Sequence, residues 1–349
     1  MYERFFGLSK TPFSLVPDAS CVHLTTQHAD AISGLAYGIL DRKGYLLLTG
    51  EAGLGKTTAL CALRELLAES KVQSSIVFNP ILTAHEFLEM VLLNFGLDQI
   101  PASKPQRLKI LEYFLVGCSV QKTVCALIID EAHKLSPDLL EEVRLLGNFE
   151  ANGQKLLQIV LVGQSELQDR LNLPELWQLK QRIALRMSLN RLDRTAVEQY
   201  VEFRWEKAGG SLPSPFTADA LEALAKWSHG IPRLVNAISD NALLVAFSET
   251  SRQVTVHHIR EACTELNLPT PQVGAAPVVR PPVSFGQPAP TPISSPPKVQ
   301  EAATVLEPPK VLGPPKVTPN GVGENGDGPN PWLEKQQPSL LKRWMRFSK

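Results

Sequence analysis

Strand-like patterns alternate with helical patterns along the first 190 or so residues of this 349-residue chain. Short, mostly apolar runs of the kind that buried parallel strands need occur at residues 45–49, 75–79, 124–129, 156–164 and 183–189. Helical patterns lie between them, at residues 25–40, 58–67, 84–95, 106–116, from 136 onward and at 173–182. Strands that alternate with helices predict an α/β fold, with a parallel, doubly wound sheet and helices on both of its faces.

From Asp193 onward the alternation stops and only helical patterns remain. Four of them occupy residues 193–208, 217–228, 232–247 and 256–266. Asp193 and Thr217 are residue types that cap helix N-termini. This region predicts a separate, small helical domain.

Beyond Pro269 the composition changes, because most of the chain's 28 prolines lie there and aromatic residues are almost absent. Such a segment buries too little apolar surface to offset the entropy of ordering, so it predicts a disordered, proline-rich linker. The chain then ends in a basic segment. On a helix, Leu340, Leu341 and Trp344 would share one face, opposite Lys342 and Arg346. Two interpretations stay open: a frayed cationic terminus, or a short motif that docks on a partner protein or an anionic membrane.

The N-terminal residues predict an extended arm, pinned to a core by aromatic side chains such as Phe5, Phe6 and Phe13. A helix follows, with Thr25 or Thr26 as its N-cap. His28 lies in the first turn of that helix. It is interpreted either as a contact to a nucleotide base, over which such an arm often lies, or as a capping or surface residue.

Charge and cysteine content narrow the functional classes. Lys plus Arg and Asp plus Glu both number 35, so no global basic field points to nucleic acid or to a membrane surface. The five cysteines are scattered and form no C-x-x-C pair, which favours core packing in a reducing cytoplasm over disulfides or metal binding. The N-terminus lacks a signal-peptide pattern, and no apolar run is long enough to cross a bilayer. We therefore expect a cytoplasmic protein without a transmembrane segment.

The strongest chemical signal follows the first strand pattern and precedes a helix. It fits G-x-x-x-x-G-K-[ST] and comprises Gly50, Glu51, Ala52, Gly53, Leu54, Gly55, Lys56, Thr57 and Thr58. In this context the glycines let backbone N–H groups converge on phosphates, and the helix N-terminus favours their negative charge. Lys56 would reach the β- and γ-phosphates, and the Thr57 hydroxyl would ligate Mg²⁺.

A second sequence motif argues against reading the glycine-rich motif as an ordinary turn between a strand and a helix. The apolar run at residues 124–129 ends in Asp130 and Glu131, at the strand end where such sheets bind ligands. We expect Asp130 to hold Mg²⁺, usually through water, and Glu131 to polarise the attacking water. The two stretches together predict a site for ATP and Mg²⁺.

The order of these motifs resembles the AAA+ ATPases, and more closely the ExeA/GspA type of bacterial general secretion. The motifs that carry the resemblance, in chain order, are Phe5-Phe6-Gly7-Leu8 with Pro12-Phe13, Thr49-Gly50-Glu51, Asp130-Glu131-Ala132-His133, Gly163-Gln164-Ser165-Glu166-Leu167, Gln181-Arg182-Ile183 and Gly230-Ile231-Pro232-Arg233. These families are similar in turn to transposition-targeting ATPases of the MuB/TniB type and to origin-recognition ATPases. The resemblance covers roughly the first three-quarters of the chain.

The resemblance implies roles for three further residues. Gln164 corresponds to the sensor that positions water and the γ-phosphate. Arg233 corresponds to a second sensor, which contacts the nucleotide from the helical lid. Arg182 is placed like the arginine finger that enters a neighbouring subunit's site, where its fixed charge neutralises the transition state. Arg170, Arg186 and ordinary surface pairing compete with this interpretation of Arg182.

The predicted domains follow from these boundaries. They are an N-terminal arm at residues 1–25, an AAA+ P-loop ATPase domain at 26–190, a helical lid at 191–268, a disordered Pro-rich linker at 269–331 and a basic amphipathic segment at 332–349. Secretion members of the family typically continue into a transmembrane helix and a peptidoglycan-binding domain. We expect neither here, and this departure bears on the secretion role rather than on the ATPase.

Three functions are compared on this basis. The first is a self-assembling ATPase, peripheral at the inner membrane, that drives assembly or remodelling of a secretion or envelope machine and is tethered to a membrane or envelope protein by its C-terminal segment. The second is a DNA-associated ATPase of the transposition-targeting type, which oligomerises on duplex DNA. The third is a nucleotide-gated scaffold without turnover, against which the intact set of Lys56, Asp130 and Glu131 argues.

Overall fold

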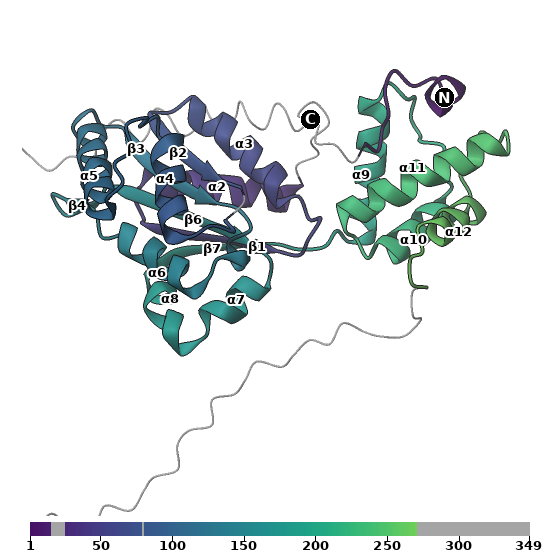
Figure 1. Ribbon diagram of the computed structural model, residues 1–349. Coiled ribbons are helices and arrows are strands. Elements are labelled where there is room, and N and C mark those ends of the chain that lie inside the picture. Colours follow the sequence, from purple (N-terminus) through teal and green to yellow (C-terminus); the bar gives the residue numbers. More distant parts are fainter. Residues whose placement is uncertain (15–24, 79, 271–349) are drawn as a thin grey trace, which may run out of the picture. The chain divides into compact units, whose positions relative to one another are not determined.

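The computed structural model describes residues 1–14, 25–78 and 80–270 (Figure 1). A five-stranded sheet has the strand order β2-β3-β6-β1-β7, and every neighbouring pair in it is parallel. The strands are β1 (Tyr45–Gly50), β2 (Val72–Val77), β3 (Val124–Ile129), β6 (Leu157–Gly163) and β7 (Ile183–Leu189). The predicted parallel α/β sheet flanked by helices is confirmed.

Helices cover both faces of this sheet. They are α2 (Thr26–Leu40), α3 (Lys56–Ala68), α4 (Ala84–Asn94), α5 (Lys104–Val120), α6 (Pro137–Leu146), α7 (Glu166–Leu171) and α8 (Trp177–Arg182). Alternate strand residues point to opposite faces. Leu47, Leu127 and Ile159 join one apolar core with the helices α4 to α8. Leu46 faces the other side, where Gly38 of α2 lies against it.

The central strands are buried on both faces, and this explains why their sequences are continuously apolar. All six residues of β1 and of β3 are buried. Full burial of one Leu or Ile side chain contributes about 1.5–3 kcal/mol, so these strands anchor the domain. The chain emerges from them at the carboxyl edge of the sheet, and every strand ends at that same edge because the strands run parallel.

The sequence pattern was less accurate at the edges of the domain. β2 begins at Val72 and ends at Val77, not at residues 75–79, because an edge strand is only partly covered and tolerates polar Gln73 and Ser74. The region 173–182 contains a short 3₁₀ turn, η3 (Pro174–Leu176), before α8. The helix α7 was not predicted, since six residues are too few to show helical periodicity.

A small hairpin was also missed. The strands β4 (Glu150–Ala151) and β5 (Gln154–Lys155) pair antiparallel across Asn152 and Gly153, both of which have positive φ. An Asn-Gly pair between two strands is typical of such a turn. The strands themselves, with two residues each, were too short to recognise.

The helical domain comprises the four predicted helices. They are α9 (Arg194–Lys207), α10 (Ala218–Ser228), α11 (Pro232–Ser248) and α12 (Val256–Glu265). The side chains of Asp193 and Thr217 accept hydrogen bonds from the backbone N–H groups of Ala196 and Ala220, so both predicted N-caps are confirmed. A second apolar core, distinct from that of the sheet, holds this domain together.

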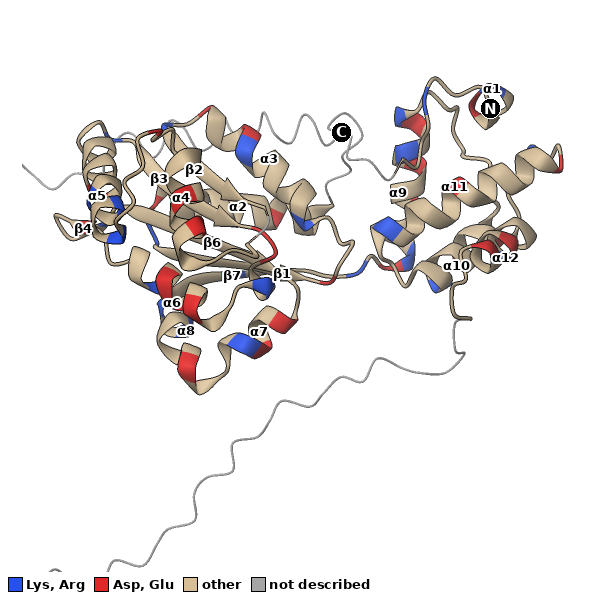
Figure 2. Cartoon of the chain, in the orientation of Figure 1, with Lys and Arg blue, Asp and Glu red and all other residues tan. Residues whose placement is uncertain are grey.

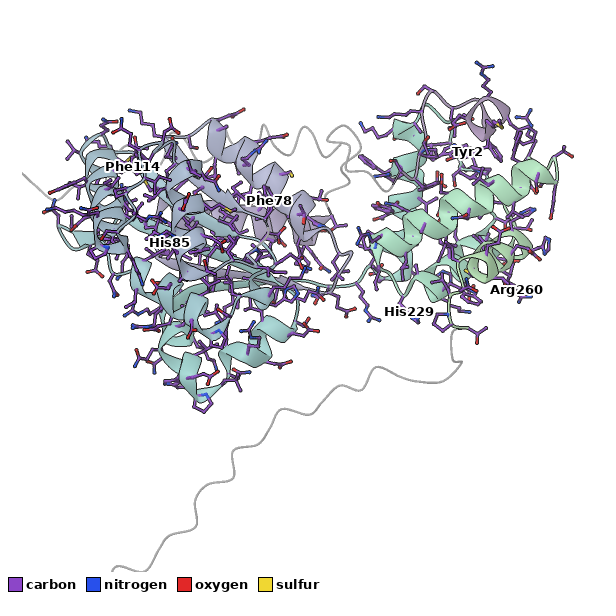
Figure 3. All side chains as sticks on the ribbon, in the orientation of Figure 1. Tyr2, Phe78, His85, Phe114, His229 and Arg260 are labelled. Carbon is purple, nitrogen blue, oxygen red and sulfur yellow. The ribbon has the colours of Figure 1, made fainter. Side chains whose placement is uncertain are left out.

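The N-terminal arm is pinned to a core by aromatic side chains, as predicted, but it is not extended throughout. Residues Tyr2–Phe6 form the short helix α1, and Tyr2, Leu8 and Phe13 join the core of the helical domain. Tyr2, which Figure 3 labels, and Phe13 are almost fully buried there. The Tyr2 hydroxyl donates to Asp240 of α11. Arg204 of α9 donates to the carbonyl oxygen of Pro12. These contacts are specified by α9 and α11, which lie far along the chain, so local sequence patterns could not reveal them.

The proline-rich linker and the basic C-terminal segment lie outside the described residues. Within residues 1–14, 25–78 and 80–270, no helix has the length and apolarity needed to cross a membrane.

Candidate functional site

The carboxyl edge of the sheet gathers the predicted site. The glycine loop follows β1, Asp130 and Glu131 follow β3, and Gln164 follows β6. Because β6 lies between β1 and β3 and all three run parallel, their ends meet at one edge. Residues that are about 35 to 115 positions apart in the sequence therefore face the same volume, as expected at the carboxyl ends of such a sheet.

Lys56 is the first residue of α3 and lies folded back over the loop. Its side chain is 6% exposed, and its Nζ donates hydrogen bonds of 2.9 Å to the carbonyl oxygens of Gly50 and of Glu51. Burial lowers the pKa of the Lys56 ammonium, and the carboxylates of Glu131, Asp130 and Glu51 oppose that shift. An ammonium has three N–H donors, so one remains for a phosphate oxygen.

Thr57 of α3 and Asp130, which follows β3, meet at the carboxyl edge of the sheet. The Thr57 hydroxyl donates a 3.0 Å hydrogen bond to Asp130 Oδ2, and Asp130 Oδ1 accepts the N–H of Glu131 at 2.8 Å. A hydroxyl and a carboxylate are the hard oxygen ligands that Mg²⁺ prefers, and Mg²⁺ keeps several waters and substrate phosphates as its other ligands. This pair therefore fits the predicted metal site.

Glu131 stands at the end of β3 with a left-handed backbone, φ 54°. Its Oε2 lies 3.2 Å from Lys134 Nζ and 3.5 Å from His133 Nε2. His133 Nδ1 in turn accepts the backbone N–H of Gln164 at 3.4 Å. His133 thus links the predicted base to the predicted sensor, a role that sequence reasoning missed although the residue stands in the quoted Asp-Glu-Ala-His motif.

The start of α11 lies against the glycine loop. The backbone N–H of Arg233 donates to the carbonyl oxygen of Gly53 at 3.3 Å. Gly53 has φ 83°, and a Cβ at this position would lie 2.9 Å from Arg233 Cβ and from Ile231 Cγ2. Only glycine fits this contact without strain. The structure therefore places the backbone of Arg233 beside the loop, and its role as a sensor stays a prediction.

Glu51 forms an ion pair that sequence reasoning also missed. Arg191, just after β7, donates from Nε to both carboxylate oxygens at 3.0 Å and from Nη2 to Oε2 at 2.7 Å. Both residues line an open hollow of about 540 Å³ at the ends of β1 and β7, together with Ser165, at the N-cap position of α7, and Gln168 of α7. Such a pair has no sequence signal, because its members lie 140 residues apart.

Arg182 is not part of this edge. It immediately precedes β7, whose first residue, Ile183, pairs with Tyr45 at the amino end of β1. Its Nη1 donates to the carbonyl oxygen of Arg144 at 3.0 Å and to Asn148 Oδ1 at 2.7 Å. Arg182 therefore lies away from its own chain's glycine loop, and its action in a neighbouring subunit stays a prediction.

The other two arginines that competed with Arg182 have intrachain partners. Arg170 donates to the carbonyl oxygens of His133 and, at 2.6 Å, Leu135, so it stabilises the turn after Glu131. Arg186 donates to the carbonyl oxygen of Lys180 at 3.0 Å.

His28 is neither a surface residue nor free to contact a base through a ring nitrogen. It is 6% exposed, and its Nε2 lies 2.9 Å from the carbonyl oxygen of Leu54 in the glycine loop. Thr25 caps α2, as one of the two predicted candidates, and accepts the His28 backbone N–H. The surface interpretation of His28 is wrong.

Comparison with known proteins agrees with this geometry. The model of the AAA domain family matches residues 39–171. General secretion pathway protein A of Aeromonas hydrophila is 40% identical over 273 residues, which cover 76% of this chain and 49% of that protein. The chain therefore contains a region that matches the AAA domain family, and it is similar to general secretion pathway protein A over about three-quarters of its length. It spans about half the length of this curated relative.

Three solved structures have a similar fold. The ORC2 protein of Aeropyrum pernix, in ADPNP–ADP complexes, matches with TM-score 0.53 and 17% identity, covering 74% of this chain and 72% of that one. Cdc6p of Pyrobaculum aerophilum matches with TM-score 0.54 and 18% identity, and the match covers 75% of this chain and 70% of that one. Drosophila ORC bound to DNA matches with TM-score 0.54 and 18% identity, and the match covers 77% of this chain and 65% of that one. At these identities the likeness shows the fold alone.

Proposed function

We propose that this protein binds and hydrolyses ATP with Mg²⁺, and that turnover drives assembly or remodelling of a secretion or envelope machine. The observation that supports hydrolysis most directly is the convergence of Lys56, the Thr57–Asp130 pair and Glu131 at one sheet edge. A cradle for phosphates alone would need neither Asp130 nor a second carboxylate beside it.

Each residue has a task in this proposal. Loop N–H groups and the free N–H of Lys56 bind the β- and γ-phosphates. Thr57 and Asp130 hold Mg²⁺, which when bound neutralises phosphate charge. Glu131 accepts a proton from the attacking water, with His133 orienting its carboxylate, and Gln164 positions that water. Arg233 neutralises charge from the helical domain, and Arg182 of a neighbouring copy does so from the other side.

Similarity to general secretion pathway protein A supports the envelope role. In this proposal the protein works from the cytoplasmic side, at the inner membrane, and residues 332–349 connect it to a membrane or envelope protein. Deletion of residues 331–349 should release the protein from the membrane fraction of cells. Unchanged membrane association of the deletion variant would contradict the tether and leave the ATPase untouched.

Duplex DNA is the second ligand to test, since one solved structure with this fold is of a protein bound to DNA. In the view of Figure 2, Lys and Arg positions are interspersed with Asp and Glu positions along the ribbon, and this arrangement does not favour a DNA-binding surface. DNA binding through phosphate contacts needs clustered Lys and Arg and weakens as salt rises.

The deciding experiment is the ATP hydrolysis rate per subunit as a function of protein concentration, with and without duplex DNA at low salt. A rate that rises with concentration and ignores DNA supports the self-assembling envelope ATPase. Stimulation by DNA that fades with added salt would replace it by the transposition-targeting function. Tight ATP binding without turnover in any condition would contradict hydrolysis and leave the gated scaffold.

A further inference from the structure

His28 lies behind the glycine loop with both ring nitrogens hydrogen-bonded. It is the third residue of α2, and its Nδ1 lies 2.7 Å from the hydroxyl oxygen of Thr25, the N-cap. Its Nε2 lies 2.9 Å from the carbonyl oxygen of Leu54. A carbonyl oxygen only accepts, so Nε2 carries the hydrogen, and in the neutral ring Nδ1 accepts from the Thr25 hydroxyl. This arrangement satisfies the neutral imidazole completely.

The hydrogen bond to Leu54 also orients the next N–H group of the loop. The Leu54 carbonyl and the Gly55 N–H belong to one planar peptide unit, which is trans here. In a trans unit the C=O and N–H bonds point in opposite directions. When His28 holds the carbonyl on its own side, the Gly55 N–H must point away from the ring. Loop N–H groups with this orientation form the cradle for phosphates.

Close packing of His28 against Gly55 also helps to hold the Leu54–Gly55 peptide unit in this orientation. Gly55 has φ 89°, and a Cβ at this position would lie 2.8 Å from His28 Nε2. The imidazole therefore fills the space that any larger residue at position 55 would need. Leu54 itself is 2% exposed, so its carbonyl would lose its hydrogen-bond partner in a buried place if His28 were removed.

A second histidine in the same chain allows the contact of His28 with the glycine loop to be distinguished from a role in helix capping. His258 stands three residues after Thr255, the N-cap of α12, as His28 stands three residues after Thr25. It is 3% exposed, and its Nδ1 accepts the Thr255 N–H at 2.8 Å. Its Nε2, however, is directed to Glu249 Oε2 at 3.0 Å, within the helical domain. Both histidines stabilise a helix start, and His28 alone reaches the glycine loop.

We propose that His28 is a positioning residue for nucleotide binding, which holds the Leu54–Gly55 peptide so that its N–H faces the phosphates. The inference rests on the proposed ATP-binding function and deepens it. His28 acts through the loop backbone and does not touch the nucleotide.

The test uses the full chain and four variants: His28→Ala, His28→Leu, His28→Gln and His258→Ala. For each, the Kd of a fluorescent ATP analogue, the kcat and KM of ATP hydrolysis and the thermal midpoint are measured. Loss of a hydrogen bond to a buried group should raise Kd and KM about tenfold in His28→Ala and His28→Leu, with a smaller change in kcat. The amide of His28→Gln can donate to the Leu54 carbonyl and should restore both constants to within about threefold.

His258→Ala is the matched control. It should lower the thermal midpoint but leave Kd and KM within about twofold, because distant sites contribute independently. His28→Leu, which fills most of the space, decides the case if His28→Ala does not fold. A lowered thermal midpoint with unchanged Kd and KM in the His28 variants would overturn the inference while ATP binding stands. Wild-type protein that binds no ATP analogue would overturn the proposed function and this inference together.

Discussion

Arg191 donates to both carboxylate oxygens of Glu51, joining the segment after β7 to the glycine loop. Arg191 stands two residues before Asp193, the cap of the first helix of the helical domain. The ion pair therefore connects the glycine loop to the segment that leads from β7 into the helical domain. Both side chains are close to half exposed, at 49% for Arg191 and 43% for Glu51.

This exposure limits what the pair contributes to stability. We predict that a double-mutant cycle with Arg191→Ala and Glu51→Ala gives a coupling free energy of about 0.2–1 kcal/mol at low salt, because water screens exposed charges. The free energy of unfolding from denaturant titration measures it. Repetition at 1 M salt should shrink the coupling toward zero. A coupling that salt leaves unchanged would show that the bidentate hydrogen bonds, not the charges, hold the two residues together.

Substitutions of Lys56 and of Glu131 should affect different steps, ATP binding and ATP hydrolysis respectively. Lys56→Ala removes the charge that faces the phosphates and should abolish detectable ATP binding. Glu131→Gln keeps the shape of the side chain, so it should bind ATP like the wild type but hydrolyse it at least about a hundredfold more slowly. Equilibrium binding and steady-state turnover measure the two effects. Glu65→Gln, on the exposed side of α3, is the control and should change neither. Normal turnover of Glu131→Gln would remove this residue as the base.

Arg182 should matter only when subunits meet. Arg182→Ala is expected to bind ATP normally but to lose the rise in activity per subunit with protein concentration. An arginine acting in trans contributes on the order of 10³ to the rate in related phosphoryl transfer. Asn148→Ala is the matched variant, since it removes an intrachain partner of Arg182 and leaves the arginine in place. If Arg182→Ala still shows the concentration-dependent rise, Arg182 is not the finger.

The contact between the N-terminal arm and α11 predicts a pH dependence. Burial raises the pKa of Asp240, which accepts the Tyr2 hydroxyl. A carboxyl group with a raised folded-state pKa stabilises the fold while protonated, and this contribution is lost as pH rises through that pKa. Asp240→Asn should therefore be at least as stable as the wild type at pH 7, and its advantage should vanish at pH values below the ordinary Asp pKa of about 4.

Denaturant titration of both proteins across this pH range checks the sign of the effect. Tyr2→Phe removes the only hydrogen bond of Asp240 that we identify in the described residues, so it should destabilise the protein most at neutral pH, where the carboxylate is charged. Lower stability of Asp240→Asn at pH 7 would contradict a raised pKa.

The fold and much of the site could be predicted from local sequence. β1, the glycine loop and α3 are consecutive, so one short stretch contains the buried strand, the turn residues and the helix start. β3 is similarly marked, because a central strand buried on both faces must be apolar throughout and its carboxylates mark its end. These signals arise from neighbouring residues, whose periodicity and backbone preferences do not depend on the rest of the molecule.

The contacts between distant segments were decided only by the tertiary structure. The Arg191–Glu51 pair, the packing of the arm on α9 and α11, and the place of His28 behind Gly55 all join residues far apart in the chain. Sequence reasoning placed His28 in a helix start, where capping alone explains a histidine. Its direction toward the loop depends on how α2 packs beside α3, and many side chains along both helices determine that packing together. The sequence by itself therefore determined which chemistry the sheet edge presents, and the packing decided which residues hold that edge in place.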